Sequence, residues 1–234
     1  MTTNIMTYTT NHTNVAPQYP VGQLSGYNHS AAYIDDVYED KKTKLFNATE
    51  ILSLLEAKRF VYMHIEKHLP VTLDKSKIVV AGGCFASLLN GEQARDYDVF
   101  LLDDEHNRNI AKALSKLFEN NHNARIGNSD YMNNDKIEHT LFFNDSKIQY
   151  ITTKYKTREE LVKHFDFRHC CVSYDLNTDK LYITREVYDL IKTKILKKNT
   201  DKVPAQWRYE KFVNERGWTA QENTIHPAYV SWKG

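Results

Sequence analysis

The sequence has no excess of charge of either sign and no long apolar run. Its 31 lysines and arginines nearly balance 30 aspartates and glutamates, for a formal net charge of +1. The protein is therefore not globally basic, and any nucleic-acid contact has to come from a local basic face. No stretch reaches the roughly 20 apolar residues of a membrane span, and the polar N-terminus does not resemble a secretory signal. We expect a soluble, intracellular protein with no membrane partner.

Cysteine is also scarce. The three cysteines, Cys84, Cys170 and Cys171, are odd in number and lack the spacing of a metal site. Free cysteines in apolar runs, like the adjacent pair here, are usually small core residues. The sequence therefore predicts buried thiols rather than a metal centre.

The length and the patterning favour one domain with appendages. At 234 residues and 41% hydrophobic composition, the chain can bury one substantial core. Residues 1–40 are rich in Thr, Asn, Tyr and Gly without an apolar period, so they predict a flexible polar arm that docks on the body or binds a protein partner. Residues 41–200 form the predicted domain, and residues 201–234 a C-terminal helix and tail.

The apolar periodicity of the domain predicts a mixed α/β (α+β) fold, a short mixed sheet flanked by helices. Predicted helices cover residues 47–70, 84–89, 107–118, 158–165, 186–196 and 206–215. Predicted strands cover residues 78–81, 96–102, 138–143, 147–152 and 181–183. Asn144 and Asp145 stand between two of these strands as the turn of a hairpin.

The residues that carry chemistry lie between Lys77 and Asp103. Because side chains alternate along a strand, Asp96 and Asp98 point to the same face, where they can hold a divalent metal. The preceding Gly82-Gly83 turn has a backbone that can approach a phosphate closely. Either motif alone is commonly a solvated strand end or a plain turn. Their joint occurrence indicates metal-assisted chemistry on a nucleotide.

The order strand, Gly-Gly, short helix, strand with Asp-x-Asp resembles the polymerase β superfamily of nucleotidyltransferases. It is most similar to the head domain of CCA-adding enzymes and bacterial poly(A) polymerases, in the compact stand-alone form typical of phage and bacterial genomes. The resemblance covers residues 77–196. It implies that Gly82 and Gly83 bind the triphosphate, and that Asp96 and Asp98 are catalytic and bind two Mg²⁺ ions.

A second matching segment lies downstream. Residues 166–175 look like the family segment Asp-Phe-Thr-x-Asn-Ala-x-x-Tyr, which lines the nucleotide. This likeness implies a catalytic role for Asp166 and a nucleotide contact for Arg168. The apolar residues of the segment also alternate as in a core strand, so a purely structural role for Asp166 stays open.

The triphosphate motif departs from the family pattern. CCA-adding heads continue Gly-Gly with Ala-Val-Arg-Asp, whereas this chain has Cys84-Phe85-Ala86-Ser87 and lacks that Arg and Asp. Ser87 is a candidate for these contacts, and so is Arg95, which stands where such heads often carry a basic residue. The long helical body that measures tRNA is also missing, so a tRNA acceptor would be held differently.

The third carboxylate of the superfamily is replaced as well. The aligned position is Gln149, which binds metal weakly and cannot act as a base, although it can still contact the nucleotide. Either Asp166, Glu138 or Asp145 reaches the site instead, or the enzyme works with two carboxylates. A third alternative is a site that binds nucleotide without turnover.

The resemblance implies an enzyme that moves a nucleoside monophosphate from ATP or CTP to a hydroxyl at an RNA 3′ end, with tRNA as the model acceptor, and releases pyrophosphate. The alternatives are nucleotidylation of a protein or small molecule, and a non-catalytic nucleotide-binding or interaction protein. A basic run predicts either a solvated helix face or an RNA-backbone contact; its candidates are Lys194, Lys197, Lys198, Arg208 and Lys211. The expected location is the cytoplasm, that of the host if a phage encodes the protein.

Overall fold

The computed structural model describes most of the predicted domain and its C-terminal helix. The described residues are 32–34, 46–68, 74–105, 109, 116, 124–127, 135–143, 147–201 and 204–221. The predicted helix at 107–118 and the turn at Asn144 and Asp145 lie essentially outside them. Within the described residues, no helix combines the length and apolar character that crossing a bilayer requires.

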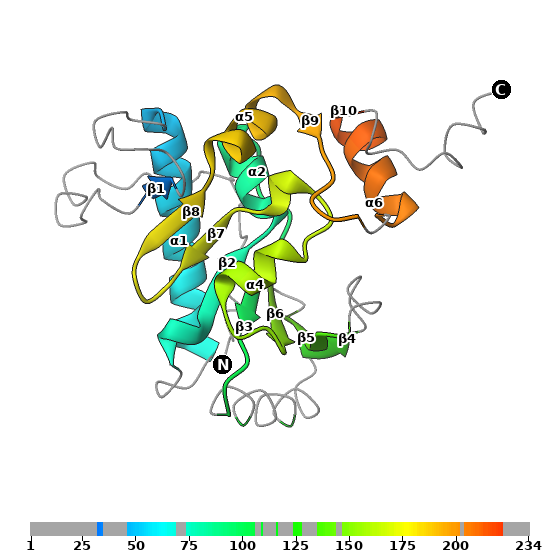
Figure 1. Cartoon of the computed structure of the whole chain (residues 1–234). Helices are drawn as coiled ribbons and strands as arrows, with labels where there is room; N and C mark the ends of the chain where they lie inside the picture. The colour runs from blue at the N-terminus through cyan, green and yellow to red at the C-terminus, as the bar shows by residue number, and fades with distance from the viewer. Residues whose placement is uncertain are drawn as a thin grey trace, which may run out of the picture.

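A mixed sheet of eight described strands forms the centre of the molecule (Figure 1). Its order is β1-β8-β7-β2-β3-β6-β5-β4. The strands are β1 (Ala32–Ile34), β2 (Ile78–Ala81), β3 (Tyr97–Leu101), β4 (Ala124–Gly127), β5 (Ile137–Phe143), β6 (Ile148–Thr153), β7 (Ser173–Asp175) and β8 (Lys180–Ile183). The β3–β6 and β1–β8 pairs are parallel and the other neighbours are antiparallel. The predicted fold class is confirmed, and the sheet extends further than the short one expected.

The central strands lie in the core because their sequences are nearly continuous apolar runs, as strands covered on both faces require. All four residues of β2 are buried, and Val99 and Phe100 of β3 are 0% exposed. On β6, Ile148, Tyr150 and Ile151 are at most 1% exposed. This rigid centre fixes the ends of β2, β3 and β6, where the acidic and glycine motifs stand.

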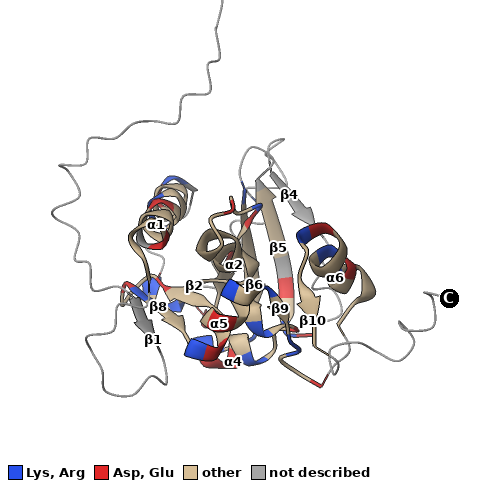
Figure 2. Cartoon of the chain, turned by 90° about the horizontal axis from the view of Figure 1, so that it is seen from above, with Lys and Arg blue, Asp and Glu red and all other residues tan. Residues whose placement is uncertain are grey.

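Helices cover the sheet. They are α1 (Ala48–His68), α2 (Gly83–Leu89), α4 (Arg158–Lys163), α5 (Arg185–Thr193) and α6 (Gln206–Glu210), the last continued by the π-helical turn η4 (Lys211–Glu215). Short 3-10 turns are η2 (Lys75–Lys77) and η3 (Arg168–Cys170). Helix α2 contacts α1, α5 and η3. Both views place α1 and α6 on opposite sides of the molecule (Figures 1 and 2).

Helix α1 begins where the sequence predicts, with Asn47 as its cap. Asn47 Oδ1 accepts from the Glu50 N–H, and a Glu50 carboxylate oxygen accepts from the Asn47 N–H, both at 2.9 Å. The Glu50 side chain is only 4% exposed and also pairs with Lys192 of α5 at 2.8 Å. One side chain thus caps α1 and ties it to α5.

Two predicted segments differ from the structure. The helix expected over 186–196 ends at Thr193, because Lys194 adopts a left-handed backbone with φ 52°. The chain then forms β9 (Ile195–Leu196), which pairs in parallel with β10 (Thr219–Ala220). Within the predicted arm, the structure describes only β1, which pairs with β8 at the sheet edge. The rest of residues 1–40 lies outside the described residues.

Candidate active site

The acid pair stands at the start of β3. Tyr97 and Val99 are 9% and 0% exposed, whereas the flanking Asp96 and Asp98 are only partly buried. The two carboxylates therefore lie on the opposite face from the buried side chains, as the strand alternation predicts. Both acids thus lie at the N-terminal end of β3, next to the buried core.

Gln149 of β6 lies next to both acids. It is the register partner of Asp98, and its Nε2 donates to Asp96 Oδ2 at 3.4 Å. The residue aligned with the third carboxylate of the resembled family is thus adjacent to the acid pair. Because an amide nitrogen faces Asp96, Gln149 positions that carboxylate and does not ligate a metal in this arrangement.

The acid pair fits a magnesium ion that takes further ligands from its substrate. Among the described residues, no group of three or more His, Cys, Asp and Glu side chains is arranged to hold a metal. Mg²⁺ is commonly bound by one or two carboxylates together with substrate phosphates and water. Asp96 and Asp98 match that donor set, and they do not form an all-protein metal cage.

The glycine turn brings the backbone against Asp98. Gly82 has φ 106°, and a Cβ at this position would lie 3.4 Å from Asp98 Oδ2. Its N–H donates to the Val172 carbonyl at 3.2 Å, so this N–H belongs to the sheet. Nothing lies within 4 Å of a Cβ position on Gly83. Gly82 thus permits the close approach, and Gly83 leaves space above the turn.

Cys84 lies beside the acid pair at the start of α2. Burial raises the pKa of its thiol, and the charges of Asp98 and Asp96 raise it further. The thiol is therefore neutral and acts as a small apolar residue next to the carboxylates, as the sequence predicts for cysteines in this chain.

Asp166 is paired with the C-terminal helix. Its carboxylate forms an ion pair with Arg208, whose Nη2 lies 3.0 Å from Oδ1 and whose Nε contacts Oδ2. The Phe167 N–H also donates to Oδ1 at 2.9 Å. The sequence predicts a catalytic role for Asp166 and RNA contact for Arg208. In the structure, each is the ion-pair partner of the other.

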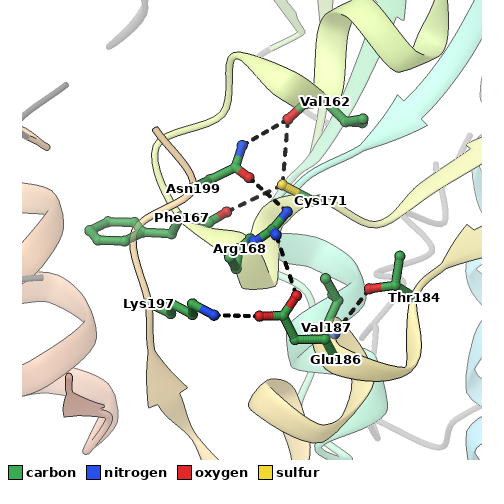
Figure 3. A network of polar contacts seen from close by, with 9 residues as sticks. All are labelled: Val162, Phe167, Arg168, Cys171, Thr184, Glu186, Val187, Lys197 and Asn199. Carbon is green, nitrogen blue, oxygen red and sulfur yellow. Dashed lines mark hydrogen bonds and ion pairs between the residues drawn. The ribbon is translucent and has the colours of Figure 1, made fainter. Parts of the chain in front are cut away.

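Arg168 belongs to a polar network that fixes the segment after α4 (Figure 3). Its Nη1 donates to Asn199 Oδ1 at 3.2 Å, and its Nη2 lies 3.3 Å from a Glu186 carboxylate oxygen. The Asn199 amide donates to the carbonyl of Val162 in the last turn of α4 and to that of Phe165 just after the helix. Lys197 pairs with Glu186 and holds the pKa of that carboxyl below its ordinary value.

The remaining basic candidates also have partners within the chain. Lys194 pairs with Glu92 at 2.8 Å, Lys198 donates to the Asp201 carbonyl at 3.4 Å, and Lys211 lies 5.9 Å from the Trp207 ring centroid. Figure 2 shows blue and red ribbon segments interleaved over α4 and α5. An RNA-backbone contact by these residues stays a prediction.

A further basic residue, Arg216 at the end of η4, reaches α2. The Arg216 Nη1 donates to Ser87 Oγ at 3.4 Å, and the guanidinium lies 5.3 Å from the Phe212 ring centroid. Burial and the nearby Arg95 lower the pKa of Arg216, while Glu92 and Asp96 act in the opposite direction. Arg95 itself is exposed and pairs with Glu215 at 3.4 Å.

Buried aromatic rings hold the C-terminal helix in place. His169 is 0% exposed, and its ring centroid lies 4.2 Å from that of Phe212 and 4.3 Å from that of Trp218. Burial lowers the pKa of His169 well below its ordinary value, and the charges of Arg208 and Arg216 lower it further. The imidazole is therefore neutral at pH 7 and packs as an aromatic core residue.

Solved structures similar to this chain include CCA-adding enzymes. An apo CCA-adding enzyme shares 15% identity with a TM-score of 0.48, over 74% of this chain and 41% of that chain. A Thermotoga maritima CCA-adding enzyme complexed with tRNA shares 16% identity with a TM-score of 0.46, over 68% and 43%. A Bacillus stearothermophilus CCA-adding enzyme in complex with CTP shares 15% identity with a TM-score of 0.45, over 74% and 42%.

A curated relative and a family model share one description. The protein "Gabija anti-defense 2" of Bacillus phage SPbetaL7 is 26% identical over 145 residues, which are 61% of this chain and 34% of the relative. The chain thus spans about a third of the length of this relative. The family model described as Gabija anti-defense 2 family protein matches residues 53–194, more than half of the chain. The chain therefore belongs to the Gabija anti-defense 2 family.

Proposed function

We propose that this chain is a metal-assisted nucleotidyltransferase, which moves a nucleoside monophosphate from a nucleoside triphosphate to an acceptor hydroxyl. The observation that carries the proposal is the juxtaposition of the acid pair with the glycine turn. Asp98 Oδ2 lies 3.4 Å from the Cβ position of Gly82, and Asp96 stands two residues away beside Gln149. Carboxylates this close to an open backbone turn suit the metal-bound phosphates of a nucleotide.

The residues of the chain would bind and orient the reactants. Asp96 and Asp98 would hold Mg²⁺ against the phosphates; when bound, Mg²⁺ neutralises phosphate charge and lowers the pKa of the attacking hydroxyl. Gln149 fixes the orientation of the Asp96 carboxylate. The acceptor oxygen bonds to the α-phosphorus, the bond to the bridging oxygen breaks, and pyrophosphate leaves. The hydroxyl proton passes to water, because the Gln149 amide is not a base.

The proposed acceptor is a protein of the Gabija defence in the host cytoplasm. Two observations favour this acceptor over the RNA 3′ end expected from the sequence. The family is described as directed against that defence. The five basic candidates for RNA contact are also engaged by other residues of the chain. ATP and CTP are the nucleotides to test first.

The second candidate function is nucleotide binding without transfer. Gln149 favours it, because the position next to Asp98 holds an amide where the resembled family has a third carboxylate. A binding protein of this kind would retain the magnesium-dependent affinity for nucleotide and release no pyrophosphate.

The test is transfer of label from each α-labelled nucleoside triphosphate with Mg²⁺, in parallel reactions containing proteins of the Gabija defence or total host RNA. The proposal expects label in a defence protein, lost in the Asp96→Asn/Asp98→Asn double variant. Asp189→Asn is the matched control: it also replaces an aspartate by asparagine, but at an exposed carboxylate of α5 that pairs with Arg185. Label in RNA alone would overturn the proposed acceptor. Tight nucleotide binding without any label would favour the second candidate.

A further inference from the structure

The glycine turn lacks a cation of its own. Helix α2, which follows Gly82, has the sequence GCFASLL, without a charged side chain. The arginine that the resembled family carries here is absent, and α2 has only seven residues. A triphosphate bears several negative charges, so a site for it needs positive charge from another part of the chain.

Arg216 reaches this position from the far end of the described chain. Its Nη1 donates to the hydroxyl of Ser87, 129 positions earlier in the sequence, at 3.4 Å. Ser87 is 4% exposed, so the guanidinium contacts a buried side chain of α2. The Asp96 carboxylate is among the charges that influence Arg216. Arg216 thus contacts α2 and lies within electrostatic reach of Asp96.

The backbone around Arg216 is held on both sides. It follows η4, whose Phe212 ring faces the guanidinium at 5.3 Å. The Trp218 N–H donates to the Phe212 carbonyl at 3.0 Å, and β10 then pairs with β9. The guanidinium is therefore presented on a fixed support, which reduces the entropy lost when it binds a ligand.

Arg216 differs from other arginines of the site in its charge partners. Arg208 pairs with Asp166, Arg168 with Glu186, and Arg95 with Glu215. Among the residues that the structure describes, no carboxylate forms an ion pair with Arg216, which donates a hydrogen bond to the Ser87 hydroxyl. The charge of Arg95 is also close enough to oppose that of Arg216. An anion that enters here relieves this repulsion and gains a hydrogen-bonding fork.

We propose that Arg216 binds the β- and γ-phosphates of the nucleotide, and so supplies from the C-terminal helix the cation that α2 lacks. This inference rests on the proposed function, because it requires a nucleoside triphosphate at the acid pair. It adds a residue that lies outside the stretch matched by the family model, which ends at 194.

The test compares ligands that differ in their phosphates. Binding of ATP, AMP and inorganic tripolyphosphate is measured by calorimetry with Mg²⁺ for the wild type, Arg216→Gln, Arg216→Lys and the control Arg185→Gln, an exposed arginine of α5. We expect Arg216→Gln to weaken ATP and tripolyphosphate binding tenfold or more and to change AMP affinity less than twofold. Arg216→Lys should lose less, and Arg185→Gln should match the wild type.

The outcomes separate this inference from the proposed function. Wild-type affinity of Arg216→Gln for ATP and tripolyphosphate overturns the role of Arg216 and leaves the proposed function standing. An equal loss of affinity for ATP and AMP also overturns the role of Arg216, since AMP lacks the β- and γ-phosphates that Arg216 would bind. A wild type that binds no nucleoside triphosphate overturns both. Thermal unfolding of each variant checks the fold, and Arg216→Lys keeps the test usable if the glutamine variant unfolds.

Discussion

The two halves of the proposed site are built from different parts of the chain. The first half, from Gly82 to Asp98, is one continuous stretch inside the region that the family model matches. The second half is the C-terminal segment, residues 195–221, which lies beyond that region and brings Arg216 back to Ser87 of the first half. Local sequence patterns therefore reveal the acid pair, whereas only the tertiary structure reveals that Arg216 contacts α2.

The two halves are also held in place differently. The acid pair stands on a central strand whose position the core fixes. The C-terminal segment docks through backbone bonds, with the Asn199 N–H donating to the Asp166 carbonyl at 2.8 Å, and through the rings around His169. Substitutions in the first half should therefore affect chemistry, and those in the second should affect docking first, apart from Arg216, whose proposed contact is with the nucleotide.

The largest effect is expected at the acid pair. Asp96→Asn or Asp98→Asn should lower the transfer rate on the order of a thousandfold, about 4 kcal/mol, because either change removes a carboxylate that holds the metal. The melting temperature should stay close to that of the wild type, since both side chains are only partly buried. Initial rates of nucleotide transfer, with Asp189→Asn as the control, measure the loss of activity. A loss below tenfold in both variants would contradict the assignment.

A smaller effect is expected at the Asp166–Arg208 pair. Truncation of either residue to Ala should reduce the free energy of unfolding by about 2 kcal/mol, because each leaves a partly buried charge without its partner. The exposed Arg185–Asp189 pair should contribute below about 0.5 kcal/mol. Denaturant unfolding of both double-mutant cycles makes the comparison. If Asp166→Ala abolished transfer while Arg208→Ala did not, Asp166 would have a catalytic role apart from docking.

The docking of the C-terminal segment should weaken in acid. The pKa of His169 is lowered in the folded state by burial and by Arg208 and Arg216, so the unfolded chain takes up a proton first as the pH falls below about 6.5. The free energy of unfolding should then decrease by up to about 1.4 kcal/mol per pH unit from this group.

The His169→Phe variant isolates that contribution. Phenylalanine keeps an aromatic ring against Phe212 and Trp218 but cannot titrate. The difference in unfolding free energy between wild type and variant should depend on pH below 6.5 and be constant above it. A difference that does not change with pH would show that His169 titrates alike in both states.

The smallest effect is expected at Gln149. Gln149→Glu places a third carboxylate beside Asp96, where the amide now donates at 3.4 Å. Repulsion should lower stability by about 1 kcal/mol without metal, and Mg²⁺ should restore it. Thermal unfolding with and without Mg²⁺ measures this. Gln206→Glu is the control, because it creates a like-charge contact with Glu210 on exposed α6. An identical magnesium response in both variants would argue against a metal at Asp96.

Several elements of the first half were predictable from the sequence because their signals are local. The strands at 78–81 and 96–102 and the helix at 84–89 follow from apolar runs separated by Gly-Gly, and the structure confirms them to within one residue. The resemblance to nucleotidyltransferases pointed to Gln149 as the position aligned with the third carboxylate, and in the structure Gln149 is the register partner of Asp98.

The helix predicted at 206–215 is present as α6 and η4, but the rest of the second half was not predictable for physical reasons. A lysine seldom adopts positive φ, so nothing in the sequence marked the end of α5 at Lys194. Strands β9 and β10 have two residues each, too few for a period-2 pattern. The Asp166–Arg208 pair joins residues 42 positions apart, and no spacing rule links them.

The most direct test of the nucleotidyltransferase is release of pyrophosphate from each nucleoside triphosphate in the presence of Mg²⁺ and extract of cells that carry the Gabija defence. The account predicts release from at least one nucleotide, with the label of its α-phosphate appearing in an acceptor. It also predicts that both signals disappear in the Asp96→Asn/Asp98→Asn protein and persist in Asp189→Asn. Folded wild-type protein that releases no pyrophosphate above the double variant would contradict the central claim.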